Sequence, residues 1–318
     1  MSHRTTALPP LSSILERKSC FILGAGASRD FTLPLWDELK PLLIDRIAKA
    51  PKSPNSNSLK SFWLDVLGNS SDDVTVDELA MDANNDDEFN FFQQKIEEIL
   101  LEGEAKSHDP DNWASKLGRA VGEIFTGDMK NAPKYARNLS VVNLNYDRCF
   151  NHYYTKGIFE SMMKRYKRQR ITQGHYQLVQ NEVENVIHPH GCIGQLNSER
   201  LIRCNVDGDY SKKEHYENIV PFGTSGTFGT NGLPPTIFPV DELHLPRLIE
   251  SNVYKLANNI ISKSEICICI GLSPLGISKS LLKLTGKDKI FYSGSETPIS
   301  NFVPLNLHAK PLIEEILA

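Results

Sequence analysis

The sequence lacks long apolar runs and a strong excess of either charge. Its hydrophobic runs fall well short of the roughly 20 residues that a bilayer-spanning helix needs. Near residue 1, no basic segment leads into an apolar stretch, so we expect a cytoplasmic protein that has no membrane partner. The formal net charge of -4 is too small to indicate a nucleic-acid partner, and we do not expect direct nucleic-acid binding.

Paired cysteines are also missing. The 6 cysteines are scattered, and there is no Cys-x-x-Cys pair that could begin a tetrahedral zinc site. We therefore expect neither a metal site nor a disulfide framework. Cys267 and Cys269 alternate within Glu265–Gly271, where a buried strand would use cysteine as a small hydrophobic side chain.

Short apolar runs alternate with segments of helical spacing along the 318 residues. Ser19–Leu23, Ser140–Leu144, Asn185–Ile187 and Ser264–Gly271 are typical of short strands, and apolar residues recur at helical spacing over Leu35–Ile47. This alternation predicts an α/β fold, a Rossmann-like parallel sheet flanked by helices. Ligands of such sheets lie at the carboxyl ends of the strands, so polar motifs after different strands can share one site.

A helical lobe is expected between the first two strands. Pro51–Asn57 is rich in Pro, Ser and Asn and is typical of a loop. From about residue 55 to residue 136, apolar residues recur at helical spacing, so we predict a single domain over residues 1–318 with a helical insertion there. Carboxylates dominate Asp72–Glu104, which we interpret as a solvated acidic face, with a partner surface as the alternative.

A glycine turn, Gly24-Ala25-Gly26-Ala27-Ser28, follows the first strand and precedes a helical segment. Glycines there let backbone N–H groups approach a pyrophosphate, and a helix N-terminus favours its charge. A dehydrogenase would add a third glycine and an acidic residue about twenty residues further on, after the next strand. The chain instead continues into Leu33-Pro34 and a helix.

Further polar motifs follow the later strands, and together with the glycine turn they resemble the sirtuin superfamily. They stand in that family's order: Gly-Ala-Gly-x-Ser at Gly24–Ser28, Asn-x-Asp at Asn145–Asp147, His-Gly at His190–Gly191, and the Gly and Ser of Gly-Thr-Ser at Gly271 and Ser273. The resemblance covers the nucleotide-binding core and implies NAD as substrate. It implies that Asn145 and His190 are catalytic, and that the cofactor-binding residues are Gly24, Ala25, Gly26, Ser28, Tyr146, Asp147, Gly271 and Ser273.

The residue types suit cleavage of the bond between nicotinamide and ribose. His190 can act as the base because imidazole titrates near neutral pH. Asn145 can position water or ribose, since an amide both donates and accepts. A structural histidine is the alternative for His190, and we assign such a role to His188. Asn145 and Asp147 could also cap a helix that starts near Arg148.

Departures from the deacylase pattern narrow the function that the resemblance implies. The paired zinc cysteines are absent, and Asn143-Leu144 replace the family's Thr-Gln. The chain looks like the divergent bacterial branch that hydrolyses NAD in anti-phage defence. We expect an NAD glycohydrolase; the alternatives are a non-catalytic sensor of NAD or ADP-ribose and, less favoured, a zinc-free protein deacylase.

A toxic hydrolase needs control, so we expect a homo-oligomer and a separate activating protein. The family suggests a HerA-type ATPase or an Argonaute-like protein as activator. A basic run, Lys164–Arg170, could contact nucleic acid or an acidic partner, but we favour a solvated helix face.

Overall fold

The computed structural model describes most of the chain up to residue 193 and several segments after it. Ser273 and residues 167–170 lie outside the described residues, so the predictions made for them are not addressed by the structure. The described residues are 8–51, 54–71, 74–107, 109–166, 174–175, 178–179, 182, 185–193, 236–237, 252–272, 290–293, 302–304 and 308–318.

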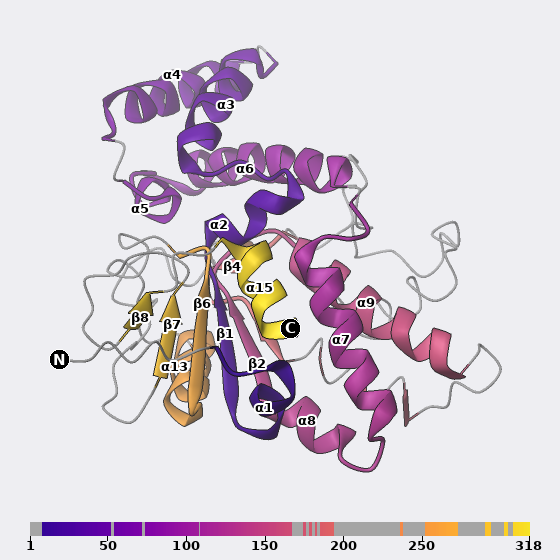
Figure 1. Cartoon of the computed structure of the whole chain (residues 1–318). Helices are drawn as coiled ribbons and strands as arrows, with labels where there is room; N and C mark the ends of the chain where they lie inside the picture. Colours follow the sequence, from indigo (N-terminus) through magenta and orange to yellow (C-terminus); the bar gives the residue numbers. More distant parts are fainter. Residues whose placement is uncertain are drawn as a thin grey trace.

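A parallel sheet of six strands, in the order β3-β2-β1-β6-β7-β8, forms the centre of the molecule (Figure 1). All neighbouring pairs in it are parallel, which confirms the predicted Rossmann-like α/β fold. A separate antiparallel pair joins β4 to β5. The strands are β1 (Ser19–Leu23), β2 (Leu139–Asn143), β3 (Val186–Ile187), β4 (Gly191–Cys192), β5 (Thr236–Ile237), β6 (Ile266–Ile270), β7 (Ile290–Ser293) and β8 (Phe302–Pro304).

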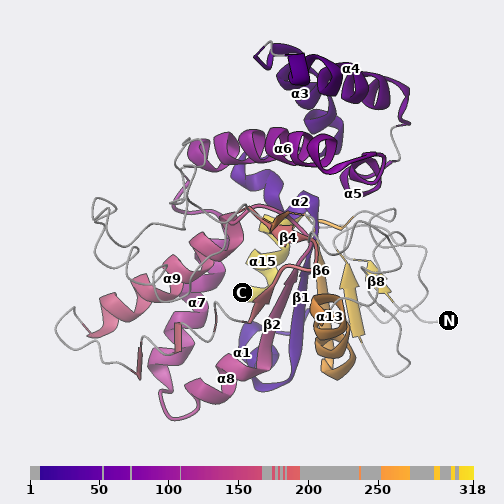
Figure 2. The same cartoon turned by 180° about the vertical axis from the view of Figure 1, so that it is seen from behind.

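Helices cover both faces of the sheet (Figures 1 and 2). One face packs on α1 (Leu11–Glu16), α7 (Trp113–Gly127), α8 (Ala132–Asn138), α9 (Cys149–Tyr166) and α15 (Ala309–Leu317). The other packs on α13 (Asn252–Lys263). Side chains of the central strands alternate between the two faces, as the two-residue period of a strand requires.

The central strands β1 and β6 are buried along their whole length. Cys20 lies opposite Cys267 in the parallel register, and both contribute to the α13 face together with Cys269. All three thiols are fully buried, so the prediction that Cys267 and Cys269 act as small hydrophobic side chains agrees with their positions.

Close backbone contact between α7 and α9 depends on glycines. A Cβ on Gly118 would lie 2.1 Å from the carbonyl oxygen of Tyr154, and one on Gly157 would lie 2.4 Å from the carbonyl oxygen of Ser115. Both distances are far below van der Waals contact, so these positions admit only glycine at the present helix separation.

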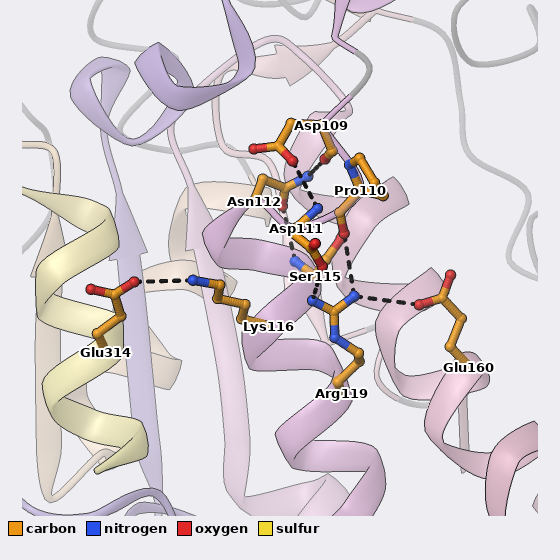
Figure 3. Close-up of polar contacts among 9 residues, drawn as sticks. All are labelled: Asp109, Pro110, Asp111, Asn112, Ser115, Lys116, Arg119, Glu160 and Glu314. Atoms are coloured by element: carbon orange, nitrogen blue, oxygen red, sulfur yellow. Dashed lines mark hydrogen bonds and ion pairs between the residues drawn. The ribbon is translucent and has the colours of Figure 1, made fainter.

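Polar contacts fix α7 from outside (Figure 3). Asn112 caps the helix by accepting a hydrogen bond from the N–H of Ser115 at 2.9 Å. Arg119 pairs with Asp111 at 2.8 Å, and Lys116 reaches Glu314 of α15 at 3.0 Å. These ion pairs lie at the surface, where each contributes little to stability.

A helical lobe stands over the carboxyl ends of the strands, where β1 runs into α2 (Ala25–Ser28) (Figures 1 and 2). It consists of α3 (Trp36–Lys49), α4 (Pro54–Asn69), α5 (Val76–Ala80) and α6 (Asp86–Lys106). Among the described residues between β1 and β2, the elements are helices and no strand occurs. The lobe already begins with α3, whereas α7 and α8 lie along the sheet.

One prediction about the lobe is wrong, and a second holds only for part of its range. The expected loop at Pro51–Asn57 gives way to α4 from Pro54 onward, because proline is well suited to the first turn of a helix. The acidic stretch is solvated at Asp86 and Asp87, but Glu97 and Glu104 are buried. Both buried carboxyls lie on one face of α6, seven residues apart, and that face meets the rest of the chain.

Candidate functional site

The glycine turn packs directly on the end of β6. The N–H of Gly24 donates to the carbonyl of Ile270, and the N–H of Gly26 donates to that of Gly271, both at 2.9 Å. A Cβ on Gly24 would lie 2.8 Å from the Gly271 oxygen. Gly271 has a φ of 66°, and a Cβ there would lie 1.9 Å from the nitrogen of Ala27.

These packing contacts are enough to explain why glycine stands at these positions, whether or not a ligand binds there. The space beside Gly24 and Gly26 is filled by Gly271 and Leu272, and the N–H of Gly26 is already hydrogen-bonded. Phosphate binding by Gly24, Ala25, Gly26 and Gly271 therefore stays a prediction. Ala25 is the first residue of α2, where a backbone N–H faces away from the helix and can meet an anion.

Ser28, Asn145 and Asp147 form one hydrogen-bonded cluster. The amide nitrogen of Asn145 donates to the carbonyl of Gly24 and to Oγ of Ser28, both at 2.9 Å. Ser28 in turn donates to Oδ2 of Asp147 at 2.7 Å. All three side chains are buried. The structure thus brings together residues predicted from two motifs that are more than a hundred positions apart.

The direction of these bonds matters for Ser28. Its hydroxyl proton is given to Asp147, and it also accepts from Asn145. A phosphate oxygen would have to displace Asp147 to accept that proton. The geometry therefore favours Ser28 as a link that orients Asn145 and Asp147, and its contact with phosphate stays a prediction.

Asp147 also contacts the first turn of α9, two residues before Cys149, the first residue of the helix. Its Oδ1 accepts the N–H of Cys149 at 2.9 Å, so the capping interpretation and membership of the cluster hold together. Burial is the main cause that raises the pKa of Asp147 to about 6, and the negative charge of Glu104 raises this pKa further. The hydrogen bond from Ser28 acts in the opposite direction and lowers it. This carboxyl therefore titrates near neutral pH.

A buried ion pair lies immediately behind the cluster. Nη2 of Arg148 lies 2.6 Å from Oε2 of Glu104, and both side chains are 0% exposed. The backbone N–H of Arg148 also donates to Glu104, at 2.8 Å. Glu104 belongs to α6, so the lobe contributes a charge to the surroundings of Asp147.

His188 is held by two contacts within the chain. Its Nδ1 lies 2.9 Å from the carbonyl oxygen of Asn145, and its Nε2 lies 3.1 Å from Oδ1 of Asn151. Burial lowers the pKa of His188 to about 4, so the ring is neutral at physiological pH. These contacts fit the structural role predicted for His188.

His190 is partly exposed and contacts two tyrosines. Its Nε2 lies 2.6 Å from the hydroxyl of Tyr254, a buried residue of α13. The ring meets that of Tyr146 edge-on, with the centroids 6.1 Å apart. The N–H of Ile193 donates to the carbonyl of Tyr146 at 2.7 Å, which ties the His190 segment to the Asn145–Asp147 turn.

Three residues of this region were missed by the sequence analysis. Glu104 stands in a stretch with many carboxylates, and nothing in the sequence sets it apart from them. Tyr254 lies on an amphipathic helix, and no sequence motif marks it. Asn143 accepts the N–H of Asn145 at 3.1 Å, while its own buried amide nitrogen has no partner within the described part of the chain. Asn143 stands where the sirtuin motif has threonine, and this difference was the one sign in the sequence that pointed to it.

Comparisons with known proteins found no matching family model, curated protein or solved structure. The resemblance to sirtuins thus rests on the motifs themselves. Within the described ranges, no helix is both long and apolar enough to span a membrane. Across the same residues, no group of His, Cys, Asp and Glu side chains is arranged to hold a metal ion.

Proposed function

We propose that the chain is an NAD glycohydrolase that cleaves NAD into nicotinamide and ADP-ribose. The observation that carries the proposal is the meeting of the predicted motifs at one edge of the sheet. The glycine turn after β1, the Asn145–Asp147 turn after β2, His190 after β3 and Gly271 after β6 all lie at carboxyl ends of parallel strands. That edge is where α/β sheets of this kind bind nucleotides.

The reaction breaks the bond between C1′ of the ribose and the nicotinamide nitrogen. The bonding electrons leave with nicotinamide, and the sugar acquires oxocarbenium character. The oxygen of a water molecule then bonds to C1′, and the water gives up one proton. The products are nicotinamide, ADP-ribose and that proton, so no redox step is required.

His190 is proposed to accept the proton from water. The hydroxyl of Tyr254 holds its Nε2 at 2.6 Å, an arrangement that orients an imidazole as a third group orients a catalytic base. Partial exposure leaves the ring accessible to substrate. The edge-on contact with Tyr146 keeps His190 near the turn that carries Asn145.

Asn145 and Asp147 are proposed to position the ribose and nicotinamide. Asn145 is oriented by Gly24 and Ser28, so its carboxamide has a defined direction. Asp147 is buried with a pKa of about 6 and can therefore donate or accept a hydrogen bond near neutral pH. This pair is suited to a ligand that offers both a carboxamide and hydroxyl groups.

We further propose that the enzyme acts in the cytoplasm and is activated by homo-oligomerisation or by a separate protein. Uncontrolled hydrolysis of NAD would harm the cell that makes the enzyme. Purified monomer that hydrolyses NAD at full rate without a partner would contradict this regulation.

The test is nicotinamide release from NAD, followed by chromatography. The purified chain is assayed alone and with the protein encoded beside it, next to His190→Ala and Asn145→Ala. We expect release by wild type under at least one of these conditions and a loss of about 100-fold in each variant, since a general base contributes 10²–10⁴-fold. Lys116→Met, which changes a surface residue of α7 outside the site, is the control.

The same assay distinguishes the non-catalytic alternative. A sensor would bind NAD or ADP-ribose in calorimetry, yet release no nicotinamide under any condition. Release that persists in both variants would contradict the proposed roles of His190 and Asn145.

A further inference from the structure

The Glu104–Arg148 pair connects the helical lobe to the proposed catalytic turn. Arg148 directly follows Asp147 in the chain, and three of its nitrogens lie within 3.2 Å of the Glu104 carboxylate: the backbone N, Nε and Nη2. Oε1 therefore receives the backbone N–H as well as the guanidinium. A contact that includes the main chain fixes where this residue lies, in addition to neutralising its charge.

Other contacts of the turn come from residues that directly follow strands β1 and β2. Asp147 meets Ser28 and the N–H of Cys149, and Asn145 meets Gly24 and Ser28. Glu104 reaches the turn from α6 instead. Next to it on α6, a Cβ on Gly103 would lie 2.4 Å from Leu33, so the helix end is also closely packed on the segment that follows the glycine turn.

We propose that Glu104 is a positioning residue for the candidate site: through Arg148, it holds the Asn145–Asp147 turn in the register in which Asn145 and Asp147 meet Ser28. The role in catalysis rests on the proposed function, whereas the positioning of the turn does not. The inserted lobe then forms part of the site, because the position of α6 determines the geometry of the Asn145–Asp147 turn.

Stability alone does not account for this arrangement. Burying two charges removes them from water, and well-packed apolar residues of similar volume are often as stable or more stable. Apolar side chains at both positions could not accept the N–H of Arg148. A carboxylate at position 104 does so, and it gives the turn a single register.

The test combines Glu104→Gln and Arg148→Lys with a control of similar stability loss. Gly122→Ala is that control, because a Cβ there would lie 2.7 Å from the carbonyl oxygen of Ile158, between α7 and α9 and outside the cluster. Hydrogen–deuterium exchange of the peptide covering residues 143–150 is measured in the full chain. We expect exchange about tenfold faster in the two site variants, and no such change in Gly122→Ala.

Kinetics supply the second readout. Under the conditions in which wild type releases nicotinamide, Glu104→Gln should lower kcat about 100-fold, the size of effect that misplacement of reacting groups by about 1 Å produces. KM should change by less than about threefold. Gly122→Ala should keep the kcat of wild type at a temperature where it is folded.

The outcomes separate this inference from the proposed function. Unchanged exchange at residues 143–150 in both site variants would overturn the positioning role, whatever the activity. Faster exchange in a protein whose wild type never cleaves NAD would support positioning and contradict the hydrolase. Equal loss of kcat in Gly122→Ala would reduce Glu104 to a general contributor to stability and overturn the inference.

Discussion

Two regions of the molecule differ in where their charged side chains lie. One is the flank formed by α7, α9 and α15, and the other is the end of the sheet beneath the lobe. On the flank, ion pairs such as Lys116–Glu314 lie at the surface (Figure 3). Inside, glycines of α7 and α9 pack against backbone atoms of the facing helix. At the sheet end, Arg148 and Glu104 are fully buried beside Asp147. The charged groups of the flank stay in contact with solvent, whereas those at the sheet end are removed from it.

This difference indicates where the molecule retains residues for a purpose other than stability. A buried carboxyl of raised pKa, a buried ion pair and an Asn143 amide nitrogen with no partner among the described residues occur within one short turn and its neighbours. Each lowers stability compared with an apolar residue that packs well. Perturbed groups gathered in this way are typical of functional sites.

The largest effect is expected from breaking the buried pair on one side only. Arg148→Met leaves Glu104 buried without its counter-charge and should lower the free energy of unfolding by about 3–5 kcal/mol. The double variant that adds Glu104→Gln should recover part of that loss, because no unpaired charge remains. Urea denaturation of the single and double variants measures this, and a double variant less stable than Arg148→Met would contradict it.

The second largest loss of stability is expected from adding a side-chain atom at the contact between α7 and α9. Gly118→Ala places a Cβ 2.1 Å from the carbonyl oxygen of Tyr154, so the helices must separate, and we expect a loss of about 3 kcal/mol in urea denaturation. Gly127→Ala, on the same helix, has nothing within 4 Å of the added Cβ and is the control. Equal effects in the two variants would show that the close approach of α7 and α9 is unimportant.

Removal of a buried carboxyl from the lobe should stabilise the protein in a pH-dependent way. Burial raises the pKa of Glu97 to about 8, while its unfolded value is about 4.3. The folded chain therefore keeps a proton that the unfolded chain loses, and stability falls as pH rises from about 4 to about 8. Glu97→Gln should raise stability by up to about 4 kcal/mol at pH 7.5 and leave it unchanged at pH 4.

Thermal unfolding across this pH range measures the effect, and Glu102→Gln on the same helix is the matched control. The hydrogen bond from Arg46 lowers the pKa of Glu102, so its removal should act in the opposite direction, with a small loss of stability at neutral pH. A parallel shift of both variants with pH would contradict the burial of Glu97 as the cause.

The smallest effect is expected at the surface of the flank. Lys116→Met removes the 3.0 Å pair with Glu314 and should change the free energy of unfolding by less than about 0.5 kcal/mol, since exposed ion pairs contribute little. Urea denaturation at low and high salt measures it. A loss comparable to that of Arg148→Met would remove the contrast between the two regions.

Much of the fold could be predicted because its signals are local. The strand Ser19–Leu23 agrees with β1 at both ends, and the helical spacing over Leu35–Ile47 agrees with α3 within two residues. Buried parallel strands give continuous apolar runs, and these are visible without tertiary information. At Pro54, helix-start and loop signals look alike in the sequence, and the prediction there was wrong.

The site could be predicted only where a motif marks it. Short motifs indicated Ser28, Asn145 and Asp147, and the structure brings these side chains together. Glu104 could not be found, because nothing local distinguishes a solvated glutamate from one that meets an arginine 44 positions further on. Long-range pairing of this kind is decided by how the lobe sits on the sheet, which the spacing of residues does not encode.

The most direct test of the central claim is where NAD contacts the chain. Hydrogen–deuterium exchange of His190→Ala, a variant designed to keep the substrate intact, is compared with and without saturating NAD. The account predicts protection concentrated in residues 23–31, 143–150 and 188–193, at the carboxyl ends of β1, β2 and β3. Protection elsewhere in the chain, with these segments unchanged, would contradict it.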